Sequence, residues 1–184
     1  MNKNVVCQMI TVKDKTFVPF IGTDAIDKRV AELATEINTD YEGKNPLFIG
    51  VLNGSFIFAA DLFKKVVIPA QITFIKLASY SATESTGTVE EVLGLNVDIA
   101  NRHIVIVEDI VDTGLTMTEL LKTLKEYQPL SVAVATLLHK PEAAKKKVEL
   151  KYVGFPSENK VVVGYGLDYD GYGRNLPSIY ILSE

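Results

Sequence analysis

The stretch IVIVEDIVDTGLT, from Ile104 to Thr116, decides the fold class. Its first four residues are apolar and β-branched, which is typical of a strand buried on both faces of a parallel sheet covered by helices. Three carboxylates follow within five residues, before a turn containing Thr-Gly leads into a helical pattern. Open α/β sheets bind their ligands at the carboxyl ends of the strands. The stretch therefore predicts a ligand site at the end of a central strand.

Each residue type in this stretch suits an anionic or hydroxylated ligand. Glycine lets backbone N–H groups approach an anion closely, and a helix N-terminus attracts negative charge. We therefore predict a phosphate-binding loop at Thr113, Gly114, Leu115 and Thr116. Carboxylates would repel a phosphate, so Glu108, Asp109 and Asp112 are expected to face sugar hydroxyls, a protonatable group or a divalent metal. The alternative is that Asp112 or Thr113 only caps the helix, but a cap needs one such residue rather than the whole group.

The hydrophobic strand, the two adjacent acids and the sequence Asp-Thr-Gly-x-Thr together resemble the phosphoribosyl-pyrophosphate motif of the type I phosphoribosyltransferases. The resemblance implies that Glu108 and Asp109 bind the ribose hydroxyls and that residues 113–116 bind the 5′-phosphate. It also implies that Asp112 lies near the reacting nitrogen of the base and is the catalytic residue. The fold expected for such a protein is an α/β domain with a mostly parallel twisted sheet flanked by helices.

The composition favours one domain in a reducing compartment. With 184 residues, 47 % of them hydrophobic, the chain can form one well-packed core, so we expect a single domain over residues 1–184. The net charge of −4 gives no basic surface for nucleic acid. Cys7 has no second cysteine to pair with, no apolar run reaches the roughly 18 residues that span a bilayer, and the first residues lack the features of a signal peptide. We expect a cytoplasmic protein with no membrane partner.

Hydrophobic periodicity predicts the remaining elements. We expect a helix from Thr23 to about Tyr41, capped by Thr23 or Asp24, and further helices at 56–65 and 117–127. The expected core strands are residues 47–52, 71–77, 92–95, 104–107 and 131–138, within a core of about residues 22–150. The short β-like runs at 5–12, 17–21, 152–155, 161–166 and 178–182 are expected to form a small hood over the site, from residues 1–21 and 151–184.

A second strand–turn–helix unit predicts another anion site. The apolar strand that ends at Leu52 runs into Asn53, Gly54 and Ser55 before a helical stretch, which is the geometry of an anion site at a helix N-terminus. The alternative is an ordinary turn between a strand and a helix. By resemblance this is the pyrophosphate loop, entered through a cis peptide between Leu52 and Asn53. Purine-salvage members usually carry a basic residue where Asn53 stands, so binding of the pyrophosphate is expected to depend more on metal.

The 6-oxopurine branch of the family supplies expectations for the base and the metal. Lys140 follows the last predicted core strand, and by resemblance it donates to the exocyclic oxygen of the purine, since an ammonium is a donor only. The alternative is a lysine that snorkels at a strand end. The segment VGYGLDYDGYGRNLP resembles the hood sequence of this branch, which implies that Asp168 contacts the purine site and Mg²⁺ and that Arg174 binds pyrophosphate. Val161 and Val162 are expected to cover the purine, although the family normally has an aromatic residue at position 161.

The polar segment from Ser79 to Glu91 is expected to be a mobile functional loop, since loops this long are uncommon in compact domains. Family members close such a loop over the reacting centre, and the resemblance assigns the start of this lid to Ser79 and Tyr80. The alternative is a disordered hairpin tip. The basic run from Ala143 to Lys147 is expected to be a solvated helix face, with a nucleic-acid patch as the alternative.

The resemblance runs from about Leu47 to Pro177 and implies a purine-salvage enzyme. The expected reaction transfers phosphoribosyl from 5-phospho-α-D-ribosyl 1-diphosphate to hypoxanthine and guanine, giving IMP or GMP and pyrophosphate. Mg²⁺ held by Glu108, Asp109 and Asp168 is the expected cofactor, and a homodimer or homotetramer is the expected assembly. The alternatives are a phosphoribosyltransferase that prefers xanthine and a non-catalytic regulator that binds the diphosphate. A regulator would need a nucleic-acid surface, which the acidic net charge does not favour.

Overall fold

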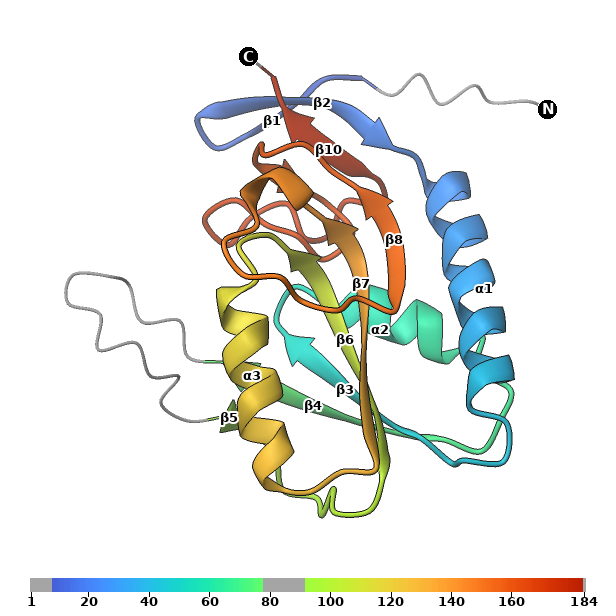
Figure 1. Ribbon diagram of the computed structural model, residues 1–184. Helices are drawn as coiled ribbons and strands as arrows, with labels where there is room; N and C mark the ends of the chain where they lie inside the picture. The colour runs from blue at the N-terminus through green and yellow to red at the C-terminus, as the bar shows by residue number, and fades with distance from the viewer. Residues whose placement is uncertain (1–7, 78–91, 184) are drawn as a thin grey trace.

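The computed structural model describes residues 8–77 and 92–183, and within these ranges it has two sheets and three α-helices (Figure 1). The larger sheet has six strands in the order β5-β4-β3-β6-β7-β8. Their bounds are β3 Leu47–Leu52, β4 Gln71–Leu77, β5 Val92–Leu93, β6 His103–Val111, β7 Ser131–His139 and β8 Tyr152–Pro156. Neighbouring strands are parallel except β4 and β5. The mostly parallel α/β sheet predicted from the sequence is confirmed.

Helices cover both faces of this sheet, as Figure 1 shows. The helices α1 Thr23–Asp40 and α2 Phe56–Phe63 pack on one face, and α3 Leu115–Glu126 packs on the other. Because successive side chains of a strand point to opposite faces, Val105 and Val107 contribute to the core beneath α1 and α2, and Ile104 and Ile106 to the core beneath α3. Burial on both faces explains why the start of β6 is apolar at every position.

The smaller sheet is a hood made from both ends of the chain. Its strand order is β1-β2-β10-β9, with antiparallel pairing throughout. The bounds are β1 Ile10–Val12, β2 Lys15–Ile21, β9 Val162–Val163 and β10 Ile179–Leu182. Phe17 and Val163 are fully buried in a small hydrophobic cluster of this sheet. In Figure 1 the hood lies beyond the arrowheads of β6 and β7, over the carboxyl ends of the core strands.

The prediction that residues 152–155 belong to the hood is wrong. The strand β8 instead pairs in parallel with β7 at the edge of the core sheet. Tyr152 is buried in the core that α1 covers. Arg29 of α1 donates from Nη2 to the carbonyl of Val153 at 2.9 Å and from Nε to that of Gly154 at 3.2 Å. This support comes from a helix distant in sequence, so the local pattern of β8 carries no sign of it.

The central strand is longer than its apolar run predicts. β6 continues to Val111, so Glu108 and Asp109 lie within the strand rather than after it. Pairing with β7 holds this polar part in the ladder, with Glu108 opposite Thr136 and Val111 opposite His139. The carboxylates are therefore fixed by sheet hydrogen bonds as well as by their own side-chain contacts.

Two helix predictions are wrong, one about the cap of α1 and one about a helix after β7. The N-cap of α1 is Gly22, rather than Thr23 or Asp24. The helix face expected at residues 143–147 does not form, because the chain makes only one 3-10 turn at Pro141–Ala143. Proline suits the first turn of a helix, but the chain that follows is used for a contact with the phosphate loop, described below.

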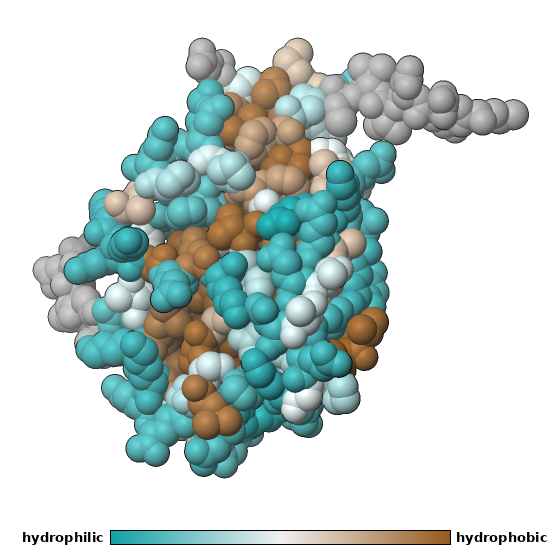
Figure 2. Space-filling view, turned by 45° about the vertical axis from the view of Figure 1, so that its right-hand side comes forward, coloured by the Kyte–Doolittle hydropathy of each residue, from teal (hydrophilic) through white to brown (hydrophobic). Residues whose placement is uncertain are grey.

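The side of the molecule that carries α1 has a largely hydrophilic surface. Figure 2 turns this side towards the viewer and shows mostly hydrophilic side chains beside a hydrophobic band. The helix itself buries Ile26, Val30, Leu33 and Ile37, at the three- and four-residue spacing of an amphipathic helix. In the part of the chain that the structure describes, no helix has the length and apolar character needed to cross a membrane.

We expect Arg29→Ala to lower the free energy of unfolding by about 1–3 kcal/mol, because it removes charged hydrogen bonds to the backbone of β8. The control is Lys28→Ala at an exposed position of the same helix, which should change the stability by less than about 0.5 kcal/mol. Urea unfolding of the two variants measures the difference. Equal stability would show that Arg29 does not support the edge strand.

Candidate active site

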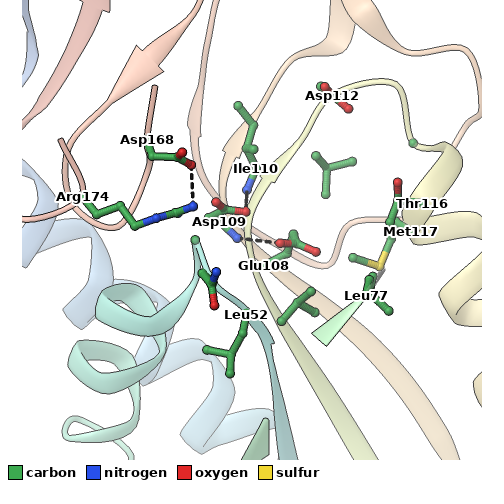
Figure 3. Close-up of a pocket in the computed structure, with 15 residues that line it drawn as sticks. Leu52, Leu77, Glu108, Asp109, Ile110, Asp112, Thr116, Met117, Asp168 and Arg174 are labelled. Carbon is green, nitrogen blue, oxygen red and sulfur yellow. Dashed lines mark hydrogen bonds and ion pairs between the residues drawn. The ribbon is translucent and has the colours of Figure 1, made fainter. Parts of the chain in front are cut away.

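A pocket of about 330 Å³ lies at the carboxyl end of the core sheet (Figure 3). Its walls come from the loop after β3, the end of β4 at Leu77, the second half of β6, the start of α3 and the hood. The predicted site residues that line it are Asn53, Gly54, Glu108, Asp109, Asp112, Gly114, Thr116, Asp168 and Arg174. Thr113 and Leu115 belong to the same loop as Gly114 but are not part of the lining. Four segments that are far apart in sequence thus meet at one pocket.

Glu108 and Asp109 form the acidic wall of this pocket. Each carboxylate accepts a hydrogen bond from the backbone N–H of the next residue, as Figure 3 shows. Asp109 N–H donates to Glu108 Oε1 at 3.1 Å, and Ile110 N–H donates to Asp109 Oδ1 at 2.9 Å. Asp112 is exposed beyond the end of β6, and its carboxylate accepts from Thr113 N–H. Local backbone donors therefore orient all three acids.

Gly54 allows the loop after β3 to lie against the acidic wall. A β-carbon at this position would overlap the carboxylate of Asp109, so the loop can approach only without a side chain. Ser55 Oγ donates to the carbonyl of Val51 at 2.6 Å and closes the turn. The peptide between Leu52 and Asn53 is cis, as the resemblance implies. Both predicted anion loops therefore line the same pocket.

The phosphate loop is supported from outside the pocket. Its Gly114 has a φ of 74° and is the N-cap of α3, so the alternative in which Asp112 or Thr113 caps the helix is wrong. The backbone N–H groups of Lys145 and Lys146 both donate to the carbonyl of Thr113, at 2.9 and 3.0 Å. Sequence reasoning missed this support, because it joins two segments through backbone atoms and leaves no pattern of side chains.

The hood contributes one cation and one further acid. Arg174 Nη2 lies 2.6 Å from Asp168 Oδ1, and the two side chains are only 27 % and 28 % exposed. Asp168 also accepts from Gly171 N–H at 2.6 Å, and Arg174 Nη1 donates to the carbonyl of Gly166 at 2.7 Å. Figure 3 shows the pair on the hood side of the pocket, near Asp109. An anionic ligand would compete with Asp168 for the guanidinium.

Of the four residues predicted to contact the purine, Asp168 lines this pocket, and Lys140, Val161 and Val162 lie outside it. Lys140 is 9 % exposed and donates from Nζ to the carbonyl of Lys160 at 2.7 Å. Val162 packs into the main core, and Val161 packs against the hood cluster. Lys140, Val161 and Val162 are in the described part of the chain, yet none of them lines the pocket. The hydrogen bond to Lys160 still places Lys140 beside the segment that carries the two valines.

Residues 22–170 match the family model described as phosphoribosyl transferase domain. The chain belongs to the phosphoribosyltransferase family. The matched range contains the whole core sheet, both anion loops and Asp168. The resemblance stated from the sequence is therefore confirmed.

Curated relatives agree with this assignment. The phosphoribosyltransferase is 44 % identical over 162 residues to the hypoxanthine-guanine-xanthine phosphoribosyltransferase of Tritrichomonas foetus, with 88 % of each chain covered. It is 40 % identical over 165 residues to the hypoxanthine-guanine phosphoribosyltransferase of Streptococcus pneumoniae, covering 89 % of this chain and 92 % of that protein. A bifunctional protein TilS/HprT of Listeria monocytogenes is 41 % identical over 163 residues, and this chain spans only about a quarter of its length, 25 %.

Solved structures give the same result. A hypoxanthine-guanine phosphoribosyltransferase from Bacillus anthracis superimposes with a TM-score of 0.82 at 36 % identity, covering 90 % of this chain and 96 % of that one. The hypoxanthine phosphoribosyl transferase of Trypanosoma cruzi superimposes with a TM-score of 0.85 at 34 % identity, covering 95 % of each chain. The fold predicted for the phosphoribosyltransferase is thus found in crystal structures of its relatives.

Ionisation of the acidic wall of the phosphoribosyltransferase is energetically unfavourable. Burial raises the pKa of Glu108 well above its ordinary value, and the carboxylates of Asp109 and Asp112 raise it further. The hydrogen bond from the Asp109 backbone acts in the opposite direction. Adjacent carboxylates resist ionising together, so the wall favours a ligand that brings a cation or shares a proton.

Lys140 and Asp112 lie within electrostatic reach of each other. Burial lowers the pKa of the Lys140 ammonium, and the negative charge of Asp112 opposes this shift. The predicted base-binding lysine is therefore coupled to an acid that lines the pocket, although the lysine itself does not line it.

The carboxylates fit a divalent metal that is shared with a ligand. Among residues 8–77 and 92–183, no group of three His, Cys, Asp or Glu side chains could hold a metal on its own. Mg²⁺ is usually bound through one or two carboxylates together with substrate phosphates. The predicted ligands Glu108, Asp109 and Asp168 all line the pocket, which suits such an ion. Asp168 would exchange its contact with Arg174 for the metal.

The predicted lid residues Ser79 and Tyr80 lie outside the described residues. Leu77, the last residue of β4, lines the pocket. The strand that precedes the predicted lid thus ends at the site.

We expect the acidic wall to make stability depend on pH. The pKa of Glu108 is higher in the folded protein than in the unfolded chain, so between the two values the unfolded state binds fewer protons and the free energy of unfolding falls as pH rises. Glu108→Gln should remove this loss, so the variant should gain stability relative to the wild type as pH rises from about 4.5 towards the raised pKa of Glu108.

Urea unfolding across this range, in metal-free buffer, measures the effect. Glu142→Gln, at an exposed position in the 3-10 turn, is the control and should follow the wild type. A Glu108→Gln variant with the same pH dependence as the wild type would contradict the raised pKa.

Proposed function

We propose that this phosphoribosyltransferase transfers the phosphoribosyl group of 5-phospho-α-D-ribosyl 1-diphosphate to hypoxanthine and guanine, giving IMP or GMP and pyrophosphate. The proposal depends on one observation, that a single pocket is lined by both anion loops, by the three carboxylates at the end of β6 and by an arginine of the hood. A sugar with a phosphate at one end and a diphosphate at the other has the matching chemistry. The names of the relatives from Streptococcus pneumoniae and Tritrichomonas foetus support a 6-oxopurine as the acceptor.

The 5′-phosphate and the ribose would bind along β6 and the start of α3. The backbone N–H groups at the N-terminus of α3, around Gly114 and Thr116, attract an anion. Glu108 and Asp109 would accept hydrogen bonds from the ribose hydroxyls. Because its pKa is raised, Glu108 can also donate when it is protonated. Sugar hydroxyls both donate and accept, so they suit this wall in either protonation state.

The pyrophosphate would lie between the loop after β3 and the hood. Backbone groups at Asn53 and Gly54 face it from the core, and Arg174 offers a fork of donors from the hood. Asn53 brings no positive charge, which leaves Arg174 as the cation of this subsite among the described lining residues. Mg²⁺, bound through Asp168 and the substrate, would neutralise the charge of the leaving group.

The base would enter near Asp112 and Lys140. Cleavage at the anomeric carbon is expected to run ahead of attack by the purine nitrogen, as in other glycosyl transfers with an oxocarbenium-like centre. Asp112 is exposed on the pocket wall, where it can take the proton of the purine's imidazole ring. Lys140 would turn from the carbonyl of Lys160 to donate to the 6-oxo group.

Assembly and location stay predictions. We propose a homodimer or homotetramer on the family resemblance alone, and a cytoplasmic location on the composition of the chain. Analytical ultracentrifugation of the purified protein tests the assembly.

The deciding experiment offers Mg²⁺, the ribosyl diphosphate and one base at a time, with chromatography of the nucleotide product. Hypoxanthine and guanine should give IMP and GMP, and excess chelator should abolish both. Binding of the diphosphate with no nucleotide from any base would favour the non-catalytic regulator. Product from xanthine in preference to hypoxanthine would favour the xanthine-using alternative.

We expect Asp112→Asn to lower kcat by about 10²- to 10⁴-fold while the Kd for the ribosyl diphosphate changes little, because proton transfer acts in the transition state. Asp14→Asn, at an exposed turn position outside the pocket lining, is the control and should behave as wild type. Steady-state kinetics and calorimetric titration separate the two quantities. A wild-type kcat in Asp112→Asn would remove this residue from the catalytic role.

We expect Lys140→Met to lose the discrimination between 6-oxopurines and adenine, which should be on the order of 10⁴-fold in the wild type. Adenine presents an amino donor to an ammonium that can only donate, so it leaves a buried group unpaired. Lys122→Met, on the exposed face of α3, is the control. Ratios of kcat/KM for hypoxanthine and adenine give the discrimination, and an unchanged ratio in Lys140→Met would exclude Lys140 from base recognition.

A further inference from the structure

The hood and the helix after the pyrophosphate loop are joined by a partly buried tyrosine–aspartate pair outside the pocket. The hydroxyl of Tyr165 donates to Asp61 Oδ2 at 2.7 Å, and the second oxygen of Asp61 pairs with Lys64 Nζ at 2.7 Å. Tyr165 is 6 % exposed and belongs to the hood segment, whereas Asp61 belongs to α2. Neither described residue lines the pocket. The pair therefore has no role in the contacts proposed so far.

The backbone around Tyr165 is held in an uncommon conformation. Tyr165 has a φ of 52°, and its neighbours Gly164 and Gly166 both have a φ of 100°. A bulky residue with positive φ is rare and persists only where surrounding contacts stabilise it. The N–H of Tyr165 donates to the carbonyl of Leu176 at 2.7 Å, and the ring packs in the main core. These contacts direct the hydroxyl towards α2.

The next residue, Gly166, contacts both sides of the proposed pyrophosphate subsite. Gly166 lies so close to the carbonyl of Gly54 that a β-carbon would overlap it. Arg174 Nη1 donates to the carbonyl of Gly166 at 2.7 Å, and Gly166 N–H donates to the carbonyl of Arg174 at 3.0 Å. Figure 3 shows Arg174 and Asp168 reaching from the hood towards the loop that follows Leu52. The hood cation and the core loop thus meet at one backbone position beside Tyr165.

We propose that Tyr165 and Asp61 are positioning residues, which set the distance between the hood segment that carries Arg174 and the core loop at Gly54. The identity of the ligand, pyrophosphate, rests on the proposed function. In the described part of the chain, loss of the hydroxyl leaves the hood segment held to α2 by the apolar packing of the main core, which fixes distance less tightly than a hydrogen bond to a carboxylate. Arg174 and the loop bind the same anion from opposite sides, so a small shift weakens both contacts at once.

The alternative is that the hydrogen bond between Tyr165 and Asp61 only stabilises the fold. A second tyrosine–aspartate pair in the chain serves as the control for this alternative. Tyr152 donates to Asp40 Oδ2 at 2.7 Å, and Asp40 pairs with Lys151 at 2.8 Å. This second tyrosine is 1 % exposed and lies outside the pocket lining. Burial raises the pKa of both tyrosines, so both hydroxyls stay protonated donors. The two pairs have the same chemistry, but Tyr165 and Asp61 join the hood segment to α2, whereas Tyr152 and Asp40 join β8 to α1.

The experiment compares Tyr165→Phe with Tyr152→Phe. Calorimetric titration with pyrophosphate in the presence of Mg²⁺ measures binding without any turnover, and steady-state kinetics measures the KM of each substrate. Tyr165→Phe should weaken pyrophosphate binding and raise the KM of the ribosyl diphosphate by roughly 5- to 20-fold, with the KM of hypoxanthine changed by less than about twofold. Tyr152→Phe should leave all three within about twofold of wild type while losing as much thermal stability as Tyr165→Phe.

Equal binding by the two variants would overturn the inference and leave a structural role. If the wild type binds pyrophosphate but forms no nucleotide, the proposed function fails, and the ratio of the two variants' Kd values still decides the inference. A wild type that does not bind pyrophosphate overturns both.

A double-mutant cycle adds a second criterion. Asp61→Ala should match Tyr165→Phe, and the double variant should bind pyrophosphate no more weakly than either single variant, because all three break the same bond. Asp61→Asn keeps an acceptor oxygen and should bind within about threefold of wild type. Additive losses in the double variant would show that the two residues act separately and would contradict the proposal.

Discussion

Burial of β6 on both faces is the constraint on which the rest of the structure depends. Its residues Ile104–Val107 are divided between two hydrophobic cores, one beneath α3 and one beneath α1 and α2. Parallel pairing fixes the register, with Gly50 opposite Val107 on one side and Ala135 opposite it on the other. A slip of one residue would exchange the two apolar sets and turn Glu108 and Asp109 to the wrong faces. The acidic wall therefore takes its geometry from the core.

The features that could be predicted from the sequence are those that depend on residues close together in the chain. The apolar run of β6, the turns at 53–55 and 113–116 and the helices after them are local patterns, so the parallel sheet and both anion loops were within reach of sequence reasoning. The partner of a strand is not local. The place of β8 beside β7, and the support of Thr113 by Lys145 and Lys146, join segments that no periodicity links. The same holds for Asp61 and Tyr165, which are 104 positions apart.

The pocket keeps its ionic groups partly neutralised before any ligand enters. Arg174 is paired with Asp168, and the raised pKa of Glu108 lowers the charge of the acidic wall. Burying an unpaired charge costs several kcal/mol, so such pairing makes a polar pocket compatible with a stable fold. The lysine predicted to read the base follows the same rule, because its ammonium is satisfied by a backbone carbonyl. Binding would then exchange partners rather than create contacts from free groups.

The hood joins strands that are translated before the core strands to strands that are translated after them. Its central pairing sets Ile21 against Ile179 and Phe17 against Leu182, whereas the six core strands lie between residues 47 and 156. The strand β10 is therefore translated after every core strand, so the central pairing of the hood can form only once the chain of the whole core sheet has been made. Pairings between residues distant in sequence form slowly. The hood segment that carries Arg174 is consequently added to the chain after every strand that builds the acidic wall and the sheet around it.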